Sequence, residues 1–151
     1  MTSPNEAVVP PAAPKIVPYG PSITLAQAKT AAAAALATAV EHHWAMVVAI
    51  VDPGGHLVYL EKLDETQVGS VAVAQSKARS AVLFKRATKV FQDRLAGGGD
   101  GLLVLRLQDA IPIEGGIPLI VGGHLIGAVG VSGGTSPEDG VCARAGVAAL
   151  G

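Results

Sequence analysis

Apolar and polar positions divide most of the chain into helical and extended segments. After Thr24, apolar side chains recur at helical intervals, and Gln27 completes a capping-box pattern, which predicts a helix up to His43. Residues 68–96 contain no proline and are rich in alanine, lysine and arginine. This stretch is therefore predicted to form one long helix or two helices in succession.

Two hairpins account for most of the extended segments. Residues 46–63 contain a strand that is apolar on both faces, a reversing turn at 52–55 and a returning strand. Residues 117–131 are predicted to form a second hairpin around the Gly122-Gly123 turn. Between the long helical stretch and this hairpin, residues 102–113 are expected to form a short apolar connection or a further strand.

The last helix is predicted to begin with Ser136 as its N-cap and Pro137 at its first helical position, and to end near Leu150. The order of elements favours an α+β fold with a mostly antiparallel sheet, because tight turns join neighbouring strands. Gly127 and Gly130 are three positions apart in one strand, so they face opposite sides of the sheet. We expect close packing at both, most simply by helices.

Composition narrows the choice of protein class. Half of the 151 residues are hydrophobic but only 3% are aromatic, which indicates one domain with a small aliphatic core. The formal net charge of −1 gives no general attraction for nucleic acid or for an anionic membrane, so neither is an expected partner. Cys142 is the single cysteine and is expected to be a small buried hydrophobe.

Residues 1–21 are predicted to be a proline-rich arm, and residues 22–151 a single domain. The arm holds six of the ten prolines and is expected to be extended and mobile until it meets a surface. It lacks the basic n-region and apolar h-region of a secretory signal, and no segment has the pattern of a membrane span. The expected location is therefore the cytoplasm.

Familiar catalytic and metal-binding motifs are few. There is no Walker A loop, and no pair of histidines has metal-ligand spacing, so no metal site is predicted. Ser132 stands in a formal G-x-S-x-G sequence, but its strand belongs to a glycine-turned hairpin and not to a parallel hydrolase sheet. Structural or exposed positions are the simpler explanation of the histidines, which are His42 and His43 after the first helix and His56 and His124 after Gly-Gly turns.

Lys77, Arg79, Glu114 and Asp139 are the more informative polar residues. Lys77 and Arg79 are two positions apart on a helix, so at least one faces a neighbour or the sheet while the other faces solvent. Glu114 directly precedes a Gly-Gly pair. Asp139 lies in the first turn of the last helix, where interaction with the helix N-terminus is a sufficient explanation.

Four segments together resemble the GlcG/HbpS family, which also occurs as the C-terminal domain of PduO-type cobalamin adenosyltransferases. They are VDPGGHLV at 51–58, AQSKARSA at 74–81, EGGIPL at 114–119 and GAVGVSGGTSPED at 127–139. The resemblance extends over residues 22–151. It implies a profilin-like α/β/α sandwich with a five-stranded antiparallel sheet covered by helices, assembled into a homo-oligomer.

The same resemblance implies that the protein binds haem or a related tetrapyrrole, with slow haem breakdown as a further activity of one branch of the family. No axial ligand is carried over by position, so the candidate haem ligands are His42, His43, His56 and His124. The composition is poorly suited to enclosing a porphyrin, because the chain has few aromatic residues and only two methionines to contact the ring system.

The alternative prediction is a small cytoplasmic enzyme of organic-acid catabolism, an isomerase, hydratase or deaminase. In the family's fold Lys77 would project beside two glycine loops, and a lysine with bare backbone N–H groups makes an anion site for a carboxylate. Lys77 would bind the substrate carboxylate, and Glu114 would act as the general acid or base. The other candidate ligand-binding residues are Arg79, Gly115, Gly116, Gly133, Gly134 and Asp139. The structural alternative is that Glu114 only forms a salt bridge with Lys77 or Arg79.

Overall fold

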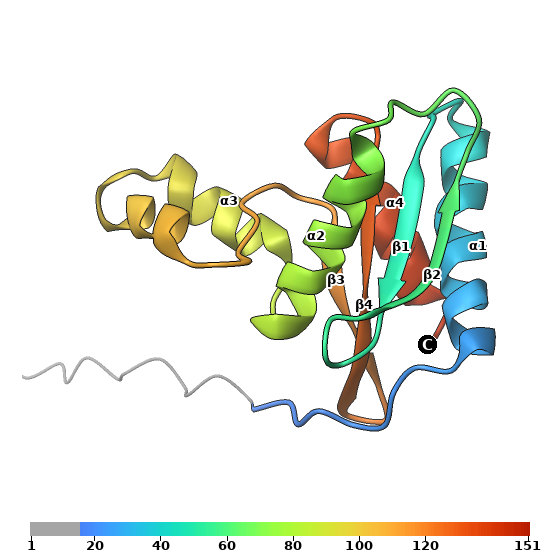
Figure 1. Ribbon diagram of the computed structural model, residues 1–151, viewed down its shortest axis with the longest axis horizontal. Helices are drawn as coiled ribbons and strands as arrows, with labels where there is room; N and C mark the ends of the chain where they lie inside the picture. The colour runs from blue at the N-terminus through green and yellow to red at the C-terminus, as the bar shows by residue number, and fades with distance from the viewer. Residues whose placement is uncertain (1–15) are drawn as a thin grey trace, which may run out of the picture.

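Four antiparallel strands form the central sheet of the computed structural model, which describes residues 16–151 (Figure 1). The strands are β1 (Val47–Val51), β2 (Leu57–Lys62), β3 (Gly116–Val121) and β4 (His124–Ser132), and their order across the sheet is β2-β1-β4-β3. Both predicted hairpins are present, as β1–β2 and β3–β4. Because β4 pairs with β1 as well as with β3, it joins the two hairpins into one sheet.

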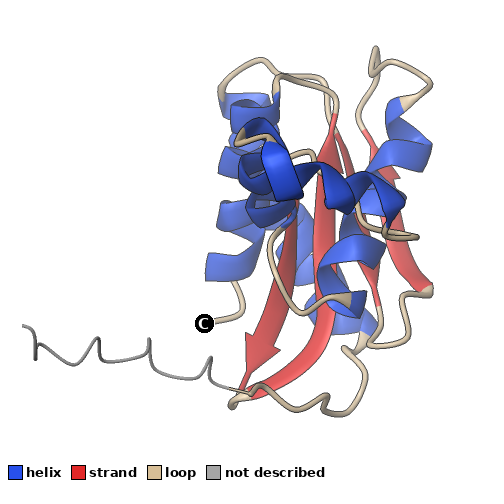
Figure 2. Ribbon diagram, turned by 90° about the vertical axis from the view of Figure 1, so that its left-hand side faces the viewer, coloured by secondary structure: helices blue, strands red, loops and turns tan. Residues whose placement is uncertain are grey.

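Helices cover both faces of this sheet. α1 (Leu25–Glu41) and α4 (Ser136–Ala148) pack against each other on one face, and α2 (Ser70–Leu83) lies on the opposite face (Figures 1 and 2). The side chains of β1 alternate between the two layers, with Val48 and Ile50 in the aliphatic core beneath α1 and α4. The predicted mixed fold, an antiparallel sheet covered by helices, is confirmed.

The sheet has four strands, not the five that the family resemblance implied. The alternative of a strand within residues 102–113 is wrong, because Gly99–Arg106 is a 3-10 helix (η1) that packs on α3 (Thr88–Ala96). Gly98 and Gly99 both have positive φ angles, which glycine adopts readily, and they turn the chain back onto α3. α3 and η1 project beyond the sheet (Figure 1), so this segment has no strand to pair with.

The predicted arm is described from residue 16 onward, and residues 16–21, here called the strap, lie along the start of β4. The backbone of Leu125 forms hydrogen bonds with Pro18 and Gly20, and Tyr19 makes a single parallel bridge to Leu125. Prolines 18 and 21 have no N–H to donate, so pairing stops at one bridge and no fifth strand forms. The rest of the arm, residues 1–15, lies outside the described residues.

The two helices that share a face of the sheet, α1 and α4, each begin with a capping box. At α1 the box of Thr24 and Gln27 is confirmed. At α4 the predicted N-cap was wrong, since Thr135 and not Ser136 holds that position. The Thr135 hydroxyl accepts from the Glu138 N–H, and the Glu138 carboxylate accepts from the Thr135 N–H at 2.9 Å. Glu138 is three residues beyond Thr135, so only Thr135 can form the reciprocal pair with it.

The predicted helical stretch at 68–96 is two helices in succession, α2 and α3. Lys85 lies just past the last turn of α2 and has a left-handed backbone, with φ 51°. A right-handed helix cannot continue through such a residue. The chain therefore changes direction at 84–87, and α3 leaves the face of the sheet. None of the helices described between residues 16 and 151 has the length and apolar character needed to cross a bilayer.

Gly127 and Gly130 face opposite sides of the sheet, as predicted. A Cβ atom on Gly130 would come within 2.0 Å of the Ala74 carbonyl oxygen, so glycine allows α2 to lie directly on β4. On the other face, a Cβ on Gly127 would meet the Val51 carbonyl oxygen at 2.3 Å and Ile23 at 3.1 Å. The expectation that a helix packs on each glycine is therefore right for Gly130. At Gly127 the segment that leads into α1, which includes Ile23, packs there instead.

Candidate functional site

Lys77 and Asp139 form a buried ion pair that connects α2 to α4 beside the end of β4. Only 1% of Lys77 is exposed, and its Nζ donates to Asp139 Oδ2 at 2.8 Å and to the Val131 carbonyl oxygen at 3.0 Å. The Gly134 N–H donates to Asp139 Oδ1 at 3.0 Å. Burial raises the pKa of the Asp139 carboxyl, and the hydrogen bonds from Lys77 and Gly134 oppose that rise.

The structure brings Lys77 together with Gly115, Gly134 and Asp139. Gly115 has φ 131°, and a Cβ there would stand 3.0 Å from Lys77 Nζ and 2.6 Å from the Val131 carbonyl oxygen, so only bare backbone fits. The Lys77 ammonium and the Gly134 N–H both donate hydrogen bonds to an anionic group here. In the structure that anion is supplied by the chain itself, as the Asp139 carboxylate.

Two other glycines of the predicted site have different neighbours. Gly116 donates its N–H to Thr88 Oγ1 at 2.9 Å, and a Cβ there would come within 2.3 Å of the Lys77 carbonyl oxygen. Gly133 packs against the chain just before β1, where a Cβ would stand 2.3 Å from the Ala45 carbonyl oxygen. Both glycines therefore permit close approach of backbone to backbone.

Glu114 has its own ion pair, separate from that of Lys77. Its Oε2 lies 3.1 Å from Arg144 Nη1, and its N–H donates to Gln92 Oε1 at 2.7 Å. The carboxylate rests on the bare Cα of Gly140, where a Cβ atom would come within 2.0 Å of Glu114 Oε2. Glu114 is buried, so this pair holds the start of β3 against α4.

Arg79 lies apart from this cluster. Its side chain is 42% exposed and its Nε is 3.8 Å from Asp109 Oδ1, whereas Lys77 is buried. The prediction that Lys77 and Arg79 face different surroundings is confirmed. The structural alternative named the wrong partners, because Glu114 pairs with Arg144 and with neither Lys77 nor Arg79.

Thr88, Gln92 and Arg144 hold residues 114–116 in place and were not singled out from the sequence. Each is a polar residue on a helix far along the chain from its partner, so no local pattern marks it. Lys77 and Glu114 are both ion-paired, and neither lines the pockets described below. Their catalytic assignment stays a prediction, and a substrate carboxylate would have to replace Asp139 at Lys77.

Cys142 is buried in α4, as predicted. Burial is the main cause that raises the pKa of its thiol to about 11, and the negative charges of Asp139 and Glu138 add to the rise. At neutral pH the group is therefore a protonated thiol, which is neither a nucleophile nor a good metal ligand.

His124 is the histidine whose surroundings suit an axial ligand. Its ring Nδ1 is 3.1 Å from the Gly122 carbonyl oxygen. In the tautomer that carries its hydrogen on Nδ1, the ring donates to this carbonyl oxygen and Nε2 keeps a lone pair for a metal. Gly20 of the strap packs against this side chain, since a Cβ on Gly20 would come within 2.5 Å of the His124 Cβ.

A pocket of about 320 Å³ adjoins His124 at the turn end of the β3–β4 hairpin. Val121 and Ile126 give it apolar walls, and Ser22, Thr24 and Gln27 give it hydroxyl and amide groups. Haem needs an axial donor, an apolar surface and hydrogen-bond donors for its propionates. This pocket provides all three, although it is small enough that part of a macrocycle would extend beyond it.

All four histidines are exposed, and the other three do not line this pocket. His42 Nδ1 lies 2.8 Å from the Thr38 carbonyl oxygen and its ring stacks on Trp44, while His56 Nδ1 lies 3.3 Å from Asp52 Oδ1. His43 follows α1 in a left-handed conformation. Within residues 16–151, no three side chains of His, Cys, Asp and Glu gather as a metal site would require.

The chain is similar to one known family along most of its length. The model of the family described as haem degrading protein HbpS-like matches residues 23–148. A 15.0 kDa protein from the dhaT-dhaS intergenic region of Citrobacter freundii is 37% identical over 120 residues, covering 78% of this chain and 84% of that protein. Escherichia coli (strain K12) GlcG is 36% identical over 92 residues, covering 61% and 67%. The solved PduOC:heme complex has a TM-score of 0.77 at 28% identity, covering 85% of this chain and 95% of that one.

Proposed function

Because the chain belongs to the HbpS-like family, we propose that it binds haem or a closely related tetrapyrrole. The observation that carries the proposal is the similarity to the PduOC:heme complex, which extends over most of both chains. Haem, when bound, supplies an iron centre that takes a nitrogen ligand from the protein.

The residues that would hold the haem lie around the pocket beside His124. The His124 Nε2 would ligate the iron in the tautomer whose Nδ1–H donates to the Gly122 carbonyl oxygen. Val121 and Ile126 would contact the apolar part of the macrocycle, and the Gln27 amide would donate to a propionate. The strap residue Gly20 lies against the His124 side chain.

Titration with hemin tests this proposal. We expect the wild-type protein to produce a shifted Soret band that saturates at one haem per chain. His124→Ala should remove the ligand to iron, so the shifted band should be lost or its affinity should fall at least about tenfold. His56→Ala is the matched control, because His56 also follows a Gly-Gly turn but lines none of the pockets described here.

The pair of variants separates axial ligation from general surface binding. If His124→Ala and wild type give the same saturating spectrum, His124 is not the ligand, and single replacements of His42 and His43 follow. If the wild-type protein shows no saturable spectral change, haem binding itself is rejected.

Two other predictions stay separate from this proposal. Slow haem breakdown would appear as decay of the Soret band after saturation, and it requires haem to bind first. The organic-acid enzyme requires turnover that disappears in Lys77→Ala and Glu114→Gln while the fold remains. Activity retained in both variants would contradict the catalytic roles of these residues.

A further inference from the structure

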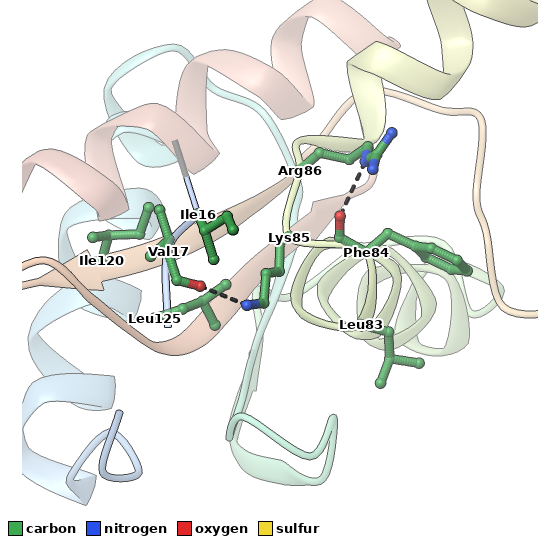
Figure 3. Close-up of a pocket in the computed structure, with 8 residues that line it drawn as sticks. All are labelled: Ile16, Val17, Leu83, Phe84, Lys85, Arg86, Ile120 and Leu125. Atoms are coloured by element: carbon green, nitrogen blue, oxygen red, sulfur yellow. Dashed lines mark hydrogen bonds between the residues drawn. The ribbon is translucent and has the colours of Figure 1, made fainter. Parts of the chain in front are cut away.

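We propose that a second pocket, on the α2 face of the molecule, binds an amphipathic carboxylate, that is, an apolar chain or ring system ending in a carboxylate. The pocket lies where the strap, the end of α2 and the β3–β4 hairpin meet (Figure 3). It does not include His124, so this inference goes beyond the proposed haem site and does not rest on it.

The walls of this pocket are largely apolar. Three separate elements contribute them, as Ile16 and Val17 from the strap, Leu83 from α2, and Ile120 and Leu125 from the hairpin. The volume is about 420 Å³, which is within the range of roughly 300–1,000 Å³ found for small-molecule sites. An apolar body would therefore remove both its own surface and these side chains from water.

Two cations stand at the same pocket. Lys85 and Arg86 line it, and within residues 16–151 neither forms a salt bridge with a carboxylate. Lys85 Nζ donates to the Val17 carbonyl oxygen and lies 4.3 Å from the centre of the Tyr19 ring, and Arg86 Nε donates to the Phe84 carbonyl oxygen at 3.0 Å. An ammonium has three donors and a guanidinium five, so both cations keep donors for a ligand.

The backbone of Lys85 supports a role for this side chain beyond ending the helix. Its φ of 51° lies in the left-handed region, which a non-glycine residue adopts only at an energetic cost. Glycine at this position would end α2 without that cost. Lysine instead places an ammonium between the strap and the end of α2, as Figure 3 shows.

Charge and shape together select the ligand class. The apolar walls favour an apolar body, and the two cations favour a negative group at one end of it. A neutral alcohol with the same chain keeps the apolar contacts but loses the charge-assisted hydrogen bonds. Comparing the acid with the alcohol therefore isolates the contribution of Lys85 and Arg86.

Decanoate and decanol are the probes, and amide NMR of the ¹⁵N-labelled protein is the measurement. We expect saturable shifts with decanoate at residues 83–86, Ile120 and Leu125, and at least about tenfold weaker binding of decanol, as one lost charge-assisted bond would give. Equal affinities for the two probes, shifts that map elsewhere, or no saturable shift would each overturn the proposal. His124→Ala should bind decanoate as wild type does when an unchanged Gly20 amide position shows that the strap stays docked, and loss of binding with the strap docked would contradict a separate site.

Variants of the two cations provide the second test. The double variant Lys85→Gln/Arg86→Gln should bind decanoate at least about tenfold more weakly, while Lys89→Gln, whose cation pairs with Asp93 on α3, should bind normally. Unchanged amide positions of Gly20 and Leu125 show that the strap stays docked. If the strap detaches in the double variant, the single variant Arg86→Gln becomes the deciding test, because Arg86 makes no hydrogen bond to the strap. Wild-type affinity in the deciding variant would overturn the proposal.

Discussion

At the scale of single residues, Gly130 shows how closely α2 lies on the sheet. The Ala74 carbonyl oxygen and the Ala78 N–H would both be within 2.6 Å of any Cβ added at Gly130. Both are backbone atoms of a packed helix, so they cannot rotate away as a flexible side chain can.

Gly130→Ala is therefore expected to destabilise the protein by about 1–3 kcal/mol, as overpacking of a core does. Gly69→Ala is the matched control, because nothing lies within 4 Å of a Cβ there and its φ of −61° suits alanine. That variant should be neutral or slightly more stable. Urea unfolding followed by circular dichroism measures both, and equal stability of the two variants would contradict the packing described here.

The ion pair of Lys77 and Asp139 makes a second prediction at this scale. Lys77→Met leaves a buried carboxylate without its partner, so the free energy of unfolding should fall by about 3–5 kcal/mol. Lys77→Met/Asp139→Leu removes both charges and should recover much of that loss. Chemical denaturation of these two variants and of Asp139→Leu completes a double-mutant cycle, which measures the interaction energy between the two charges. A loss below 1 kcal/mol in Lys77→Met would mean that the pair is not buried as described, and additive losses would mean that the two charges are not coupled.

At the scale of elements, mutation can distinguish two assignments of the N-cap of α4, which are Thr135 as in the structure and Ser136 as predicted from the sequence. Thr135→Ala removes the hydroxyl that accepts from the Glu138 N–H, so stability should fall by about 1 kcal/mol. Ser136 lies inside the helix and caps nothing, so Ser136→Ala should change stability by less than half as much. Thermal unfolding of the two variants decides between them. A larger loss of stability in Ser136→Ala than in Thr135→Ala would show that Ser136 is the N-cap.

At the scale of the whole molecule, the exposed apolar surface supports the prediction of a homo-oligomer. Leu103 and Leu105 of η1 are 66% and 64% exposed. Beside them is a pocket of about 410 Å³, which Leu103, Val104 and Leu107 line together with Arg94, Asp100 and Gly101. A surface that presents both exposed leucines and an apolar pocket with charges of both signs is suited to pairing with a second copy of itself.

We expect light scattering at micromolar concentration to give a mass of at least two chains of 15.1 kDa each. Leu103→Glu/Leu105→Glu should shift the protein towards the monomer, because burying two carboxylates in the interface is costly. Val68→Glu is the control for the start of α2, where the sequence suggested surplus apolar surface and Val68 is exposed. A wild-type mass of 15.1 kDa would reject the assembly, and dissociation only in Val68→Glu would move the interface to α2.

The local elements were predictable because short-range interactions determine them. The capping box at Thr24, the glycine turn at Gly122-Gly123 and the double-sided burial of residues 47–51 each depend on residues a few positions apart. The composition likewise indicated the small aliphatic core. Of the two alternatives for residues 102–113, a short connection or a strand, the strand was wrong, because pairing requires a neighbour that local sequence does not specify.

The sequence by itself determined most of the helices and strands, the family and the residue types of the candidate sites, because these follow from spacing and motifs. Only the tertiary structure decided which charges meet. Lys77 meets Asp139 across 62 positions because its side chain reaches past Val131 at the end of β4 to the start of α4. Glu114 meets Arg144 across 30 positions because the start of β3 lies against α4. The same packing leaves Lys85 and Arg86 beside an apolar pocket, a juxtaposition of strap, helix and hairpin that no stretch of sequence contains.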